Sequence, residues 1–517
     1  MAKYIVILGS IMSGLGKGIV TSSLLKILKE RGLKVLPLKF DGYLNVDCGT
    51  MNPYRHGEVF VLKDGTEVDM DFGHYERFLG KDLTGESSLT GGKIFKQIIE
   101  KERRGDYLGE DVQFIPHVTN LIKDHVKRYA KGQDIVIIEV GGTVGDIENA
   151  YFIEAMRQLS LEEKVLFIQL TYLPEINNEL KTKPTQHANK LIQSYGIKPS
   201  ILLLRANRKP SKEHLQKIAL YTNTNKLFYD PTLETIYELP LVLEDQNIYY
   251  AIADELGIKA KKEPDWKKWK KLVNNLKRAK RSVNIAIVGK YVENKDAYAS
   301  VKEALVHAGA HLNTKVNISF EDSSKLGNLS QYDGLIIAGG FGKRGIEGKI
   351  KAIKYARENN IPLLGICLGM QLMVVEWARN VLGWKKAHST EFNPKTPYPV
   401  VDILPEQKSI IEKGATMRLG EYPMEIKPGT LLSRIYRKKV AKERHRHRYE
   451  INPKYIKDLE KSGLIFSAFY KHVPEAIEYP NQLGIGLQSH PELTSKFEKP
   501  SPVFLWLVKQ SMKSSKK

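Results

Sequence analysis

Short runs of apolar residues alternate with helical stretches in both halves of the chain, and this alternation limits the fold more than any other feature. The runs are "YIVIL", "DIVIIEV", "KVLFIQL" and "SILLLRA" in the first half, and "VNIAIVG", "GLIIAGG" and "IPLLGIC" in the second. Runs of this length in which most residues are apolar, without strict alternation, are typical of strands buried on both faces of a parallel sheet. We therefore expect an α/β protein with two doubly wound, mostly parallel sheets and with sites at the carboxyl ends of the strands.

A chain of 517 residues is too long for one ordinary core, and its clearest boundary is lysine-rich. Pro264 and Asp265 form a helix-start signal, after which Trp266 and Trp269 begin a helical repeat of apolar residues. We expect this amphipathic basic helix to pack on a neighbouring domain, with a membrane-surface helix as the alternative. The predicted division is 1–264, a linker helix at 265–282, and 283–517.

The formal net charge is +21, and the lysines are spread along most of the chain. A basic chain can bind nucleic acid or polyanionic small substrates such as nucleotides, or can simply have a lysine-rich surface. Only Cys48 and Cys367 occur, which excludes a disulfide framework and suits a reducing compartment. The short N-terminal apolar run leads straight into a glycine loop, so we expect no signal peptide, and no apolar run reaches membrane-spanning length. We expect a cytoplasmic protein.

A glycine-rich loop, "SGLGKG" at residues 13–18, directly follows the first apolar run. Such a loop turns backbone N–H groups toward a phosphate, and Lys17 is placed to reach the outer phosphates of a nucleotide. The usual phosphate loop has Ser or Thr after its lysine to bind Mg²⁺, but Gly18 stands here. Carboxylates must then hold the metal. The candidates are Glu139, which ends a predicted strand, and Asp69 with Asp71, whose alternation favours one common face. A turn residue or a helix cap is the alternative for each.

Cys367 lies between two glycines in "LLGICLGMQ", after a predicted strand and before a predicted helix. Small neighbours permit the strained turn that exposes a nucleophile, as in the G-x-S-x-G motif, and a helix N-terminus favours the thiolate. The stretch "LQSHPELTS" supplies His490 as a base and Glu492 to orient it. We predict a Cys–His–Glu triad. A buried structural cysteine is the alternative, and it is the role we expect for Cys48.

Long strings in the first half resemble the synthetase domain of the CTP synthase family, in the same order: "SGLGKG", "NVDCGTMNPYRHGEVFV", "DFGHYERF", "KERRGDYLG", "VQFIPHVTN", "GGTVGDIE" and "KTKPTQH". The second half resembles the class I glutamine amidotransferase domain of these enzymes. The resemblance implies that ATP phosphorylates the uracil O4 of UTP and that ammonia from glutamine displaces the phosphate to give CTP. It also implies a phosphate loop of the dethiobiotin-synthetase kind, in which acidic residues take over the metal.

The resemblance further implies roles for individual residues. ATP is assigned to Gly14, Leu15, Gly16, Lys17, Gly18, Ile19 and Asp71, the transferred phosphate to Lys39, and Mg²⁺ to Asp71 and Glu139. UTP, or CTP as feedback inhibitor, is assigned to Ser13, Asp146, Ile147, Glu148, Lys181, Thr182, Lys183, Pro184, Thr185, Gln186 and Lys217. Glutamine is assigned to Gly340, Leu368, Gly369, Met370, Gln371, Glu391 and Arg448. The chemistry of the residues agrees, since Lys181 and Lys183 are cations for a triphosphate, although a solvated lysine pair is the alternative.

Two positions depart from the family pattern. Gly42, in "KFDGYLNVD", stands where proline is usual, and we expect it to loosen a turn without loss of activity. Ser489 stands where phenylalanine is usual and changes the packing beside His490. The string "RHRHRYE" around Arg448 has an RNA-binding patch as its alternative interpretation.

We predict a glutamine-hydrolysing member of this family, with UTP, ATP and L-glutamine as substrates and Mg²⁺ as cofactor. By resemblance we expect GTP as an allosteric activator, CTP as feedback inhibitor and a homotetramer, with no membrane or nucleic-acid partner. One alternative is another glutamine-dependent, ATP-using amidoligase that acts on a non-nucleotide acid. The other is a partition-type ATPase that binds DNA, although such ATPases keep Thr or Ser after the loop lysine and do not need a Cys–His–Glu triad.

Overall fold

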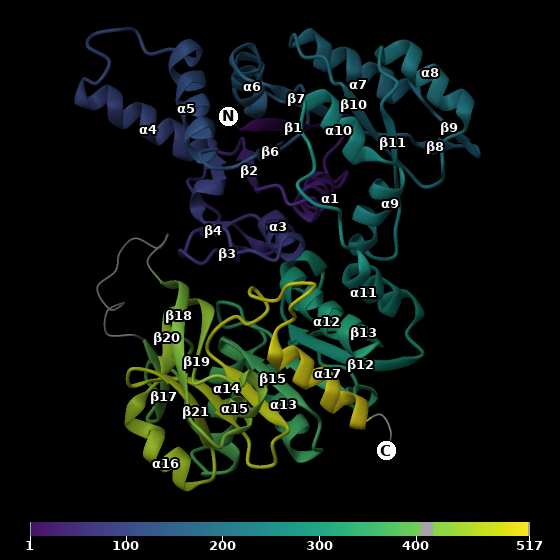
Figure 1. Ribbon diagram of the computed structural model, residues 1–517. Coiled ribbons are helices and arrows are strands. Elements are labelled where there is room, and N and C mark those ends of the chain that lie inside the picture. Colours follow the sequence, from purple (N-terminus) through teal and green to yellow (C-terminus); the bar gives the residue numbers. More distant parts are fainter. Residues whose placement is uncertain (1, 404–416, 515–517) are drawn as a thin grey trace. The chain divides into compact units, whose positions relative to one another are not determined.

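The computed structural model describes residues 2–403 and 417–514, which divide into two compact units (Figure 1). The first unit consists of the chain up to Asp47 together with His74–Val273. The second consists of Cys48–Gly73 together with the chain from Asn274 onward. A segment from the first half of the sequence therefore belongs to the second unit, which no sequence pattern indicated. The domain boundaries drawn from the sequence stay a prediction.

The first unit is built on a seven-stranded sheet in the order β11-β10-β7-β1-β6-β2-β5, in which every strand pair is parallel (Figure 1). The apolar runs of the first half form four of its strands. The strands are β1 (Lys3–Gly9), β2 (Val35–Asp41), β5 (Ser88–Thr90), β6 (Ile135–Val140), β7 (Val165–Tyr172), β10 (Ile201–Ala206) and β11 (Leu227–Pro231). The predicted parallel sheet is confirmed for this half.

Helices cover both faces of this sheet because side chains alternate in direction along each strand. Tyr4, Val6 and Leu8 of β1 face a core that is shared with α4, α5 and α6. Ile5 and Ile7 are buried on the other face, where α1 contacts β1. The helices are α1 (Lys17–Glu30), α4 (Gly91–Arg104), α5 (Thr119–Tyr129), α6 (Ala150–Glu162), α7 (Lys183–Ser194), α8 (Lys212–Thr222), α9 (Leu239–Asp245) and α10 (Ile248–Leu256).

The second unit contains a nine-stranded sheet in the order β13-β12-β14-β15-β23-β22-β21-β18-β19. The pairs from β13 to β23 are parallel, and those from β23 to β19 are antiparallel. The strands are β12 (Arg281–Gly289), β13 (Thr314–Asp322), β14 (Gly334–Ile337), β15 (Leu363–Ile366), β18 (Arg418–Ile426), β19 (Val440–His447), β21 (Ile465–Tyr470), β22 (Val473–Glu478) and β23 (Gly484–Leu487). The predicted fold class is confirmed, and the antiparallel half is an addition that the sequence patterns did not indicate.

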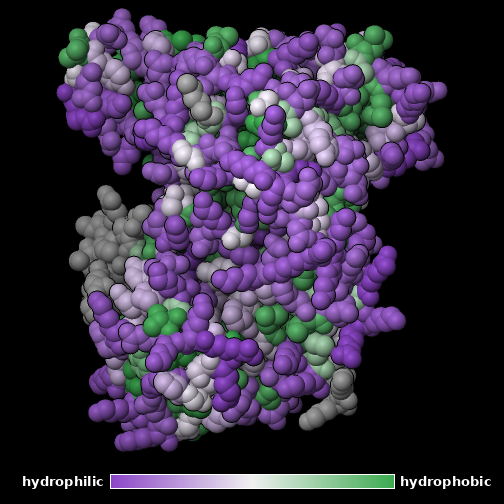
Figure 2. All heavy atoms as spheres, in the orientation of Figure 1, coloured by the Kyte–Doolittle hydropathy of each residue, from purple (hydrophilic) through white to green (hydrophobic). Residues whose placement is uncertain are grey.

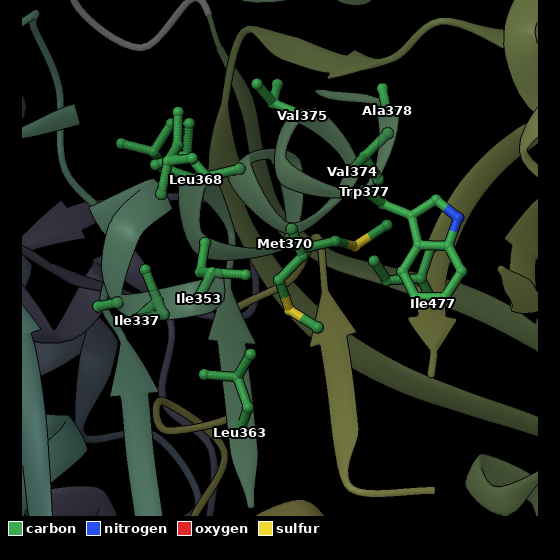
Figure 3. Packing of buried hydrophobic residues seen from close by; sticks show 14 of the residues in the cluster. Ile337, Ile353, Leu363, Leu368, Met370, Val374, Val375, Trp377, Ala378 and Ile477 are labelled. Carbon is green, nitrogen blue, oxygen red and sulfur yellow. The ribbon is translucent and has the colours of Figure 1, made fainter. Parts of the chain in front are cut away.

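Helices pack on both faces of the second sheet as well. Those on one face are α13 (Ile346–Glu358) and α14 (Leu368–Asn380), and those on the other are α12 (Ala299–Leu312) and α17 (Pro502–Ser514). Figure 3 shows Met370 and Val374 of α14 in a core with Leu363 of β15 and Ile477 of β22. This packing fixes the start of α14 against the end of β15, with Cys367 between them.

The predicted amphipathic helix forms α11 (Lys267–Arg278); its Trp269 is buried, and so is Trp266, which directly precedes the helix. The indole N–H of Trp269 donates to the carbonyl of Tyr237 at 2.7 Å, and the ammonium of Lys26 lies 4.4 Å from the indole centroid. No helix in residues 2–403 and 417–514 has the length and apolar character of a membrane span. Most of the face in Figure 2 is hydrophilic, as expected for a chain with lysines spread along it.

Candidate active sites

Cys367 occupies a strained turn between β15 and α14. Its φ of 54° and ψ of −106° are rare for a residue with a side chain, and such strain is common at functional positions. The flanking glycines permit the turn: a Cβ atom at Gly365 would lie 2.5 Å from the sulfur of Met373, and one at Gly369 would lie 2.1 Å from the carbonyl oxygen of Ile337. The predicted strand–turn–helix geometry around Cys367 is therefore present.

His490 is held by Glu492, two residues further along. Nδ1 of His490 lies 2.7 Å from Oε1 of Glu492, and the backbone N–H of His490 donates to the carbonyl of Arg444 at 2.7 Å. Burial lowers the pKa of His490, but the negative charges of Glu492 and of Cys367 outweigh it and raise the pKa to about 10. With Nδ1 bound to the carboxylate, Nε2 remains to exchange a proton with the sulfur.

A cavity of about 110 Å³ lies at the triad. The glycine turn "AGGFGKRG" at residues 338–345 lines it through Gly339, Gly340 and Phe341, together with Cys367 and His490. Segment 48–73 contributes Pro53, Glu58 and Val59.

Arg446 is a pocket residue that sequence reasoning missed. Its guanidinium forms a 2.7 Å ion pair with Glu67 and lies 5.0 Å from the ring centroid of Phe341. The only sequence signal was its place in the basic string "RHRHRYE", within which the resemblance pointed to Arg448 instead.

The remaining residues of that string are mostly interior. Arg444, His445 and His447 on β19 are buried, so an RNA-binding patch at this string is wrong. Nδ1 of His445 lies 3.0 Å from Nε2 of His447. Burial, together with the charge of Arg418, holds the pKa of both histidines well below the ordinary value, so both rings are neutral.

The predicted glutamine residues fall into two groups. Gly340 lines the cavity with a φ of +139°, and Glu391 lies 3.4 Å from the N–H of Gly342. Burial raises the pKa of Glu391, although the Gly342 N–H and the charge of Lys290 act against it. The four residues Leu368, Gly369, Met370 and Gln371 form the first turn of α14 and are buried.

The amide of Gln371 donates to the carbonyl of Tyr449 at 2.8 Å, and Met370 belongs to the core of Figure 3. Neither side chain lines the cavity, so this turn can offer its backbone N–H groups rather than its side chains. Arg448 and Glu391 both act electrostatically on Tyr449, which places these two predicted residues in one neighbourhood.

In the first unit, the glycine loop connects β1 to α1, and Lys17 is the first residue of that helix. Gly16 precedes it with a φ of 94°, and the space beside the Cα atoms of Gly14 and Gly16 is open. The ammonium of Lys17 donates to the carbonyl of Gly142 at 2.6 Å, just beyond the end of β6. The loop thus has the form of a phosphate-binding loop at the N-terminus of a helix.

Glu139 is buried at the carboxyl end of β6, with 2% of its surface exposed. One carboxylate oxygen accepts hydrogen bonds from the hydroxyls of Thr21 at 2.9 Å and Tyr75 at 2.5 Å. Lys39 of β2 is its register partner on the neighbouring strand. Thr21 was not predicted from the sequence. Its hydroxyl lies one helical turn beyond Lys17 on α1, and this spacing could have identified it.

Asp69 and Asp71 do not alternate along a strand, so the expectation of one shared face is wrong. The strand β4 (Glu67–Val68) ends before them, and the helix α3 (Asp71–Leu79) begins at the second acid. The side chain of Asp69 accepts the backbone N–H of Asp71 at 2.9 Å, as a helix cap does. Asp71 as a ligand of ATP and Mg²⁺ stays a prediction.

Most of the predicted UTP residues lie in two segments, the start of α7 and the turn at 146–148 after β6, while Ser13 follows β1 and Lys217 is on α8. Lys181 pairs with Glu179 at 2.6 Å, and the ammonium of Lys183 lies 5.5 Å from the ring centroid of Tyr221 on α8. Lys217, also on α8, helps to lower the pKa of Glu179, after the larger effect of Lys181. The three lysines therefore lie in one neighbourhood, where a triphosphate would find several cations.

The other members of this set differ in exposure. Thr182, Thr185 and Gln186 are buried, and Gln186 donates to the hydroxyl of Thr182 at 3.1 Å. Pro184 lies in the first turn of α7 rather than in a separate turn. The exposed residues are Ser13, Asp146, Ile147 and Glu148.

Gly42 is needed for a close approach of two backbones, which corrects the expectation of a merely loosened turn. A Cβ atom at this position would lie 2.5 Å from the carbonyl oxygen of Glu148 and 2.8 Å from its Cβ. Glycine therefore lets the β2 end pack against a residue predicted to bind UTP.

Two family models match the chain: "CTP synthase N-terminus" over residues 3–258 and "Glutamine amidotransferase class-I" over residues 294–510. The chain is 49% identical to the CTP synthase of Methanopyrus kandleri over 98% of both chains, and 49% identical to that of Aquifex aeolicus over 100% of both. It is 50% identical to the CTP synthase of Pyrococcus abyssi over 98% of both chains. The chain therefore belongs to the CTP synthase family, the glutamine-hydrolysing ligases whose known reaction is the glutamine-dependent formation of CTP from UTP.

Proposed function

We propose that the second unit releases ammonia from glutamine at Cys367, and that the first unit uses ATP and this ammonia to convert UTP into CTP. The observation that carries the first half is the strained Cys367 turn beside the His490–Glu492 pair. Family membership favours this reaction over the other amidoligase and the DNA-binding ATPase considered above.

In the glutaminase reaction, the sulfur of Cys367 attacks the side-chain amide carbon of glutamine after His490 has taken its proton. His490 returns that proton to the amide nitrogen, the carbon–nitrogen bond breaks, and ammonia leaves a thioester behind. Water then hydrolyses the thioester to glutamate and regenerates the thiol. The backbone N–H groups of Gly340 and Leu368 would stabilise the negative oxygen that develops at each addition.

Glutamine itself needs charged partners at its ammonium and carboxylate. Glu391 is the carboxylate for the substrate ammonium, and Arg448 is the cation for its carboxylate. The shared neighbourhood of these two side chains at Tyr449 supports the assignment.

In the synthetase reaction, the γ-phosphate of ATP passes to O4 of UTP, and ammonia then displaces inorganic phosphate from C4. Lys17 and the loop from Gly14 to Ile19 hold the phosphates of ATP, and Lys39 lies near the transferred group. The lysines at 181, 183 and 217 meet the triphosphate of UTP, or of CTP when it acts as feedback inhibitor. Ser13, the turn at 146–148 and the residues at 182 and 184–186 complete that site.

We assign Mg²⁺ to Glu139. The donor set fits a hard cation, because Glu139 is a buried carboxylate and Thr21 brings a hydroxyl oxygen to it. The part of the chain that the structure describes contains no group of three or more His, Cys, Asp or Glu that could bind a metal by themselves. That is in keeping with Mg²⁺, which takes one or two carboxylates together with phosphate oxygens and waters. When bound, the ion neutralises charge on the nucleotide phosphates.

By the same family membership we propose GTP as an allosteric activator and a cytoplasmic homotetramer. The test of the whole proposal is CTP formation from UTP, ATP, Mg²⁺ and glutamine, with each component omitted in turn. Synthesis should require UTP, ATP and Mg²⁺, and ammonium salts should replace glutamine. Persistent synthesis without ATP, or failure of ammonium to replace glutamine, would contradict it.

A further inference from the structure

Lys349 is a buried lysine directly behind the glutaminase cavity. It lies on α13, with 0% of its surface exposed. Its ammonium donates to the carbonyl of Ala338 at 2.5 Å and to the carbonyl of Gly339 at 3.3 Å. Lysines are almost never fully buried unless their charge is matched, so two backbone carbonyls are an unusual set of partners that calls for a reason.

These two carbonyls belong to the glycine turn of the cavity. A Cβ atom at Gly339 would lie 3.3 Å from Cε1 of His490 and 3.7 Å from Cβ of Cys367, so this peptide directly borders the triad. Gly340 follows with a φ of +139°, which is strained for any residue with a side chain. The turn therefore needs an external restraint to keep one orientation.

The hydrogen bond to Gly339 fixes the direction of the next N–H. A peptide group is planar and trans, so the carbonyl of Gly339 and the N–H of Gly340 point in opposite directions. Lys349 holds that carbonyl on the side of α13, which turns the N–H of Gly340 toward the other side. Within the described chain that N–H has no protein acceptor.

Lys290 holds the same turn further along. Its ammonium donates to the carbonyl of Gly342 at 3.2 Å, and its Cε would lie 3.2 Å from a Cβ atom at Gly340. Two buried lysines, one from α13 and one from the end of β12, thus restrain the turn at residues 339 and 342.

We propose that Lys349 is a positioning residue for glutamine hydrolysis, which aims the Gly340 N–H at the oxyanion by holding the Gly339 carbonyl. This rests on the proposed function of the Cys367 site. Burial lowers the pKa of Lys349 to about 7, with a further decrease from Lys290. Because the neutral amine also has N–H donors, the positioning does not depend on the charge of the side chain.

The test is Lys349→Met, which keeps the length and removes the donors. The kcat for glutamine-dependent synthesis should fall about 10- to 100-fold, as expected when an oxyanion donor is misplaced, with KM for glutamine within about threefold. Alkylation of Cys367 by iodoacetamide forms no oxyanion, so its rate should stay within about threefold of the parent. Ammonia-dependent synthesis on the same preparation should also be unchanged. Lys354→Met, an exposed lysine on the same helix, is the matched control.

An unchanged kcat in Lys349→Met would overturn the proposal. A parallel fall in glutamine-dependent kcat and in the alkylation rate of Lys349→Met would overturn it too, because Lys349 would then act on the thiol or on the fold. Lys349→Gln restores a buried N–H donor, so its kcat should be at least about tenfold higher than that of Lys349→Met. Equal kcat values in the two variants would contradict the hydrogen-bonding role. Failure of the proposed function itself is seen separately, as glutamine-dependent synthesis that survives Cys367→Ala.

Discussion

Nδ1 of His490 lies 2.7 Å from Oε1 of Glu492, and this pair sets the protonation of the glutaminase site. The carboxylate orients the imidazole and favours its charged form. Burial alone would make the ring neutral, but Glu492 and Cys367 raise its pKa to about 10. The resting site therefore holds an imidazolium, which is the proton donor that the leaving ammonia needs.

The first prediction concerns stability and pH. The pKa of His490 rises from an ordinary 6.5 to about 10 on folding, so the folded state binds the proton more tightly. The resulting stabilisation should be present in full below pH 6.5 and lost as the pH rises through 10. Urea unfolding of the parent and of Glu492→Gln between pH 6 and 10 measures it. The difference in unfolding free energy should shrink with increasing pH, and a constant difference would contradict the assignment. Glu460→Gln, in an exposed ion pair with Lys427, should show no such trend.

Lys17→Ala should abolish synthesis from either nitrogen source, because O4 must be phosphorylated before any amine attacks. Loss of a cation that neutralises phosphate charge in the transition state should lower kcat by at least about 100-fold. Rates with glutamine and with ammonium on the same preparation are the measurement. Lys131→Ala, at an exposed turn, is the control. Near-normal synthesis from ammonium would rule out the phosphate loop.

Glu139→Gln should reduce ammonia-dependent synthesis about 100-fold or more while the protein stays folded. The amide oxygen can still accept from Thr21 and Tyr75, while the charge that a metal requires is lost. The dependence of the rate on Mg²⁺ should shift to higher concentration. If neither the rate nor the Mg²⁺ dependence changes, Glu139 is a structural acid that anchors those two hydroxyls.

Gly42→Ala should weaken UTP binding. The new Cβ atom would overlap the carbonyl oxygen of Glu148 at 2.5 Å, so the turn at 146–148 must move. We expect a loss of about 1–3 kcal/mol in stability and a higher KM for UTP with ammonium as nitrogen source. Gly105→Ala, where φ is +79° and the space is open, should lower stability without changing that KM. An unchanged KM in Gly42→Ala would mean that Glu148 does not contact UTP.

The strands that carry both sites could be predicted from the sequence because they are mostly apolar, with Glu139 as the exception near the end of β6. β1 and β6 are neighbouring strands that are buried on both faces. Glu139 lies near the carboxyl end of β6, and the glycine loop follows the carboxyl end of β1, so both are at the same edge of the sheet. Cys367 could be predicted from local sequence as well, because Gly365 and Gly369, two residues before and after it, permit the strained turn of a nucleophile elbow. Local chemistry and local pattern agree at these positions.

The rest depends on long-range packing that no local pattern encodes. Strand β19 buries the polar residues Glu443, Arg444 and His445, so no run of apolar residues marks it in the sequence. Segment 48–73 belongs to the second unit through contacts such as that of Glu67 with Arg446. Lys349 looks like a surface lysine in the sequence, and only its two carbonyl partners reveal its position.

The last prediction separates the two reactions. Cys367→Ala removes the sulfur that attacks the glutamine amide, so no thioester can form and no ammonia is released. His490 and Glu492 are arranged for a thiolate and cannot supply a nucleophile in its place. Glutamine-dependent synthesis should fall by about three orders of magnitude or more.

Synthesis from ammonium salts at alkaline pH, where more of the nitrogen is NH₃, should remain within about threefold of the parent in Cys367→Ala, because free ammonia replaces the glutaminase product. The paired rates with both donors on one preparation are the decisive measurement. Cys48→Ala removes the other buried cysteine and should leave both rates unchanged. Equal loss with both donors in Cys367→Ala would mean that this residue supports the fold or the UTP reaction, and the division of chemistry between the two units would then be wrong.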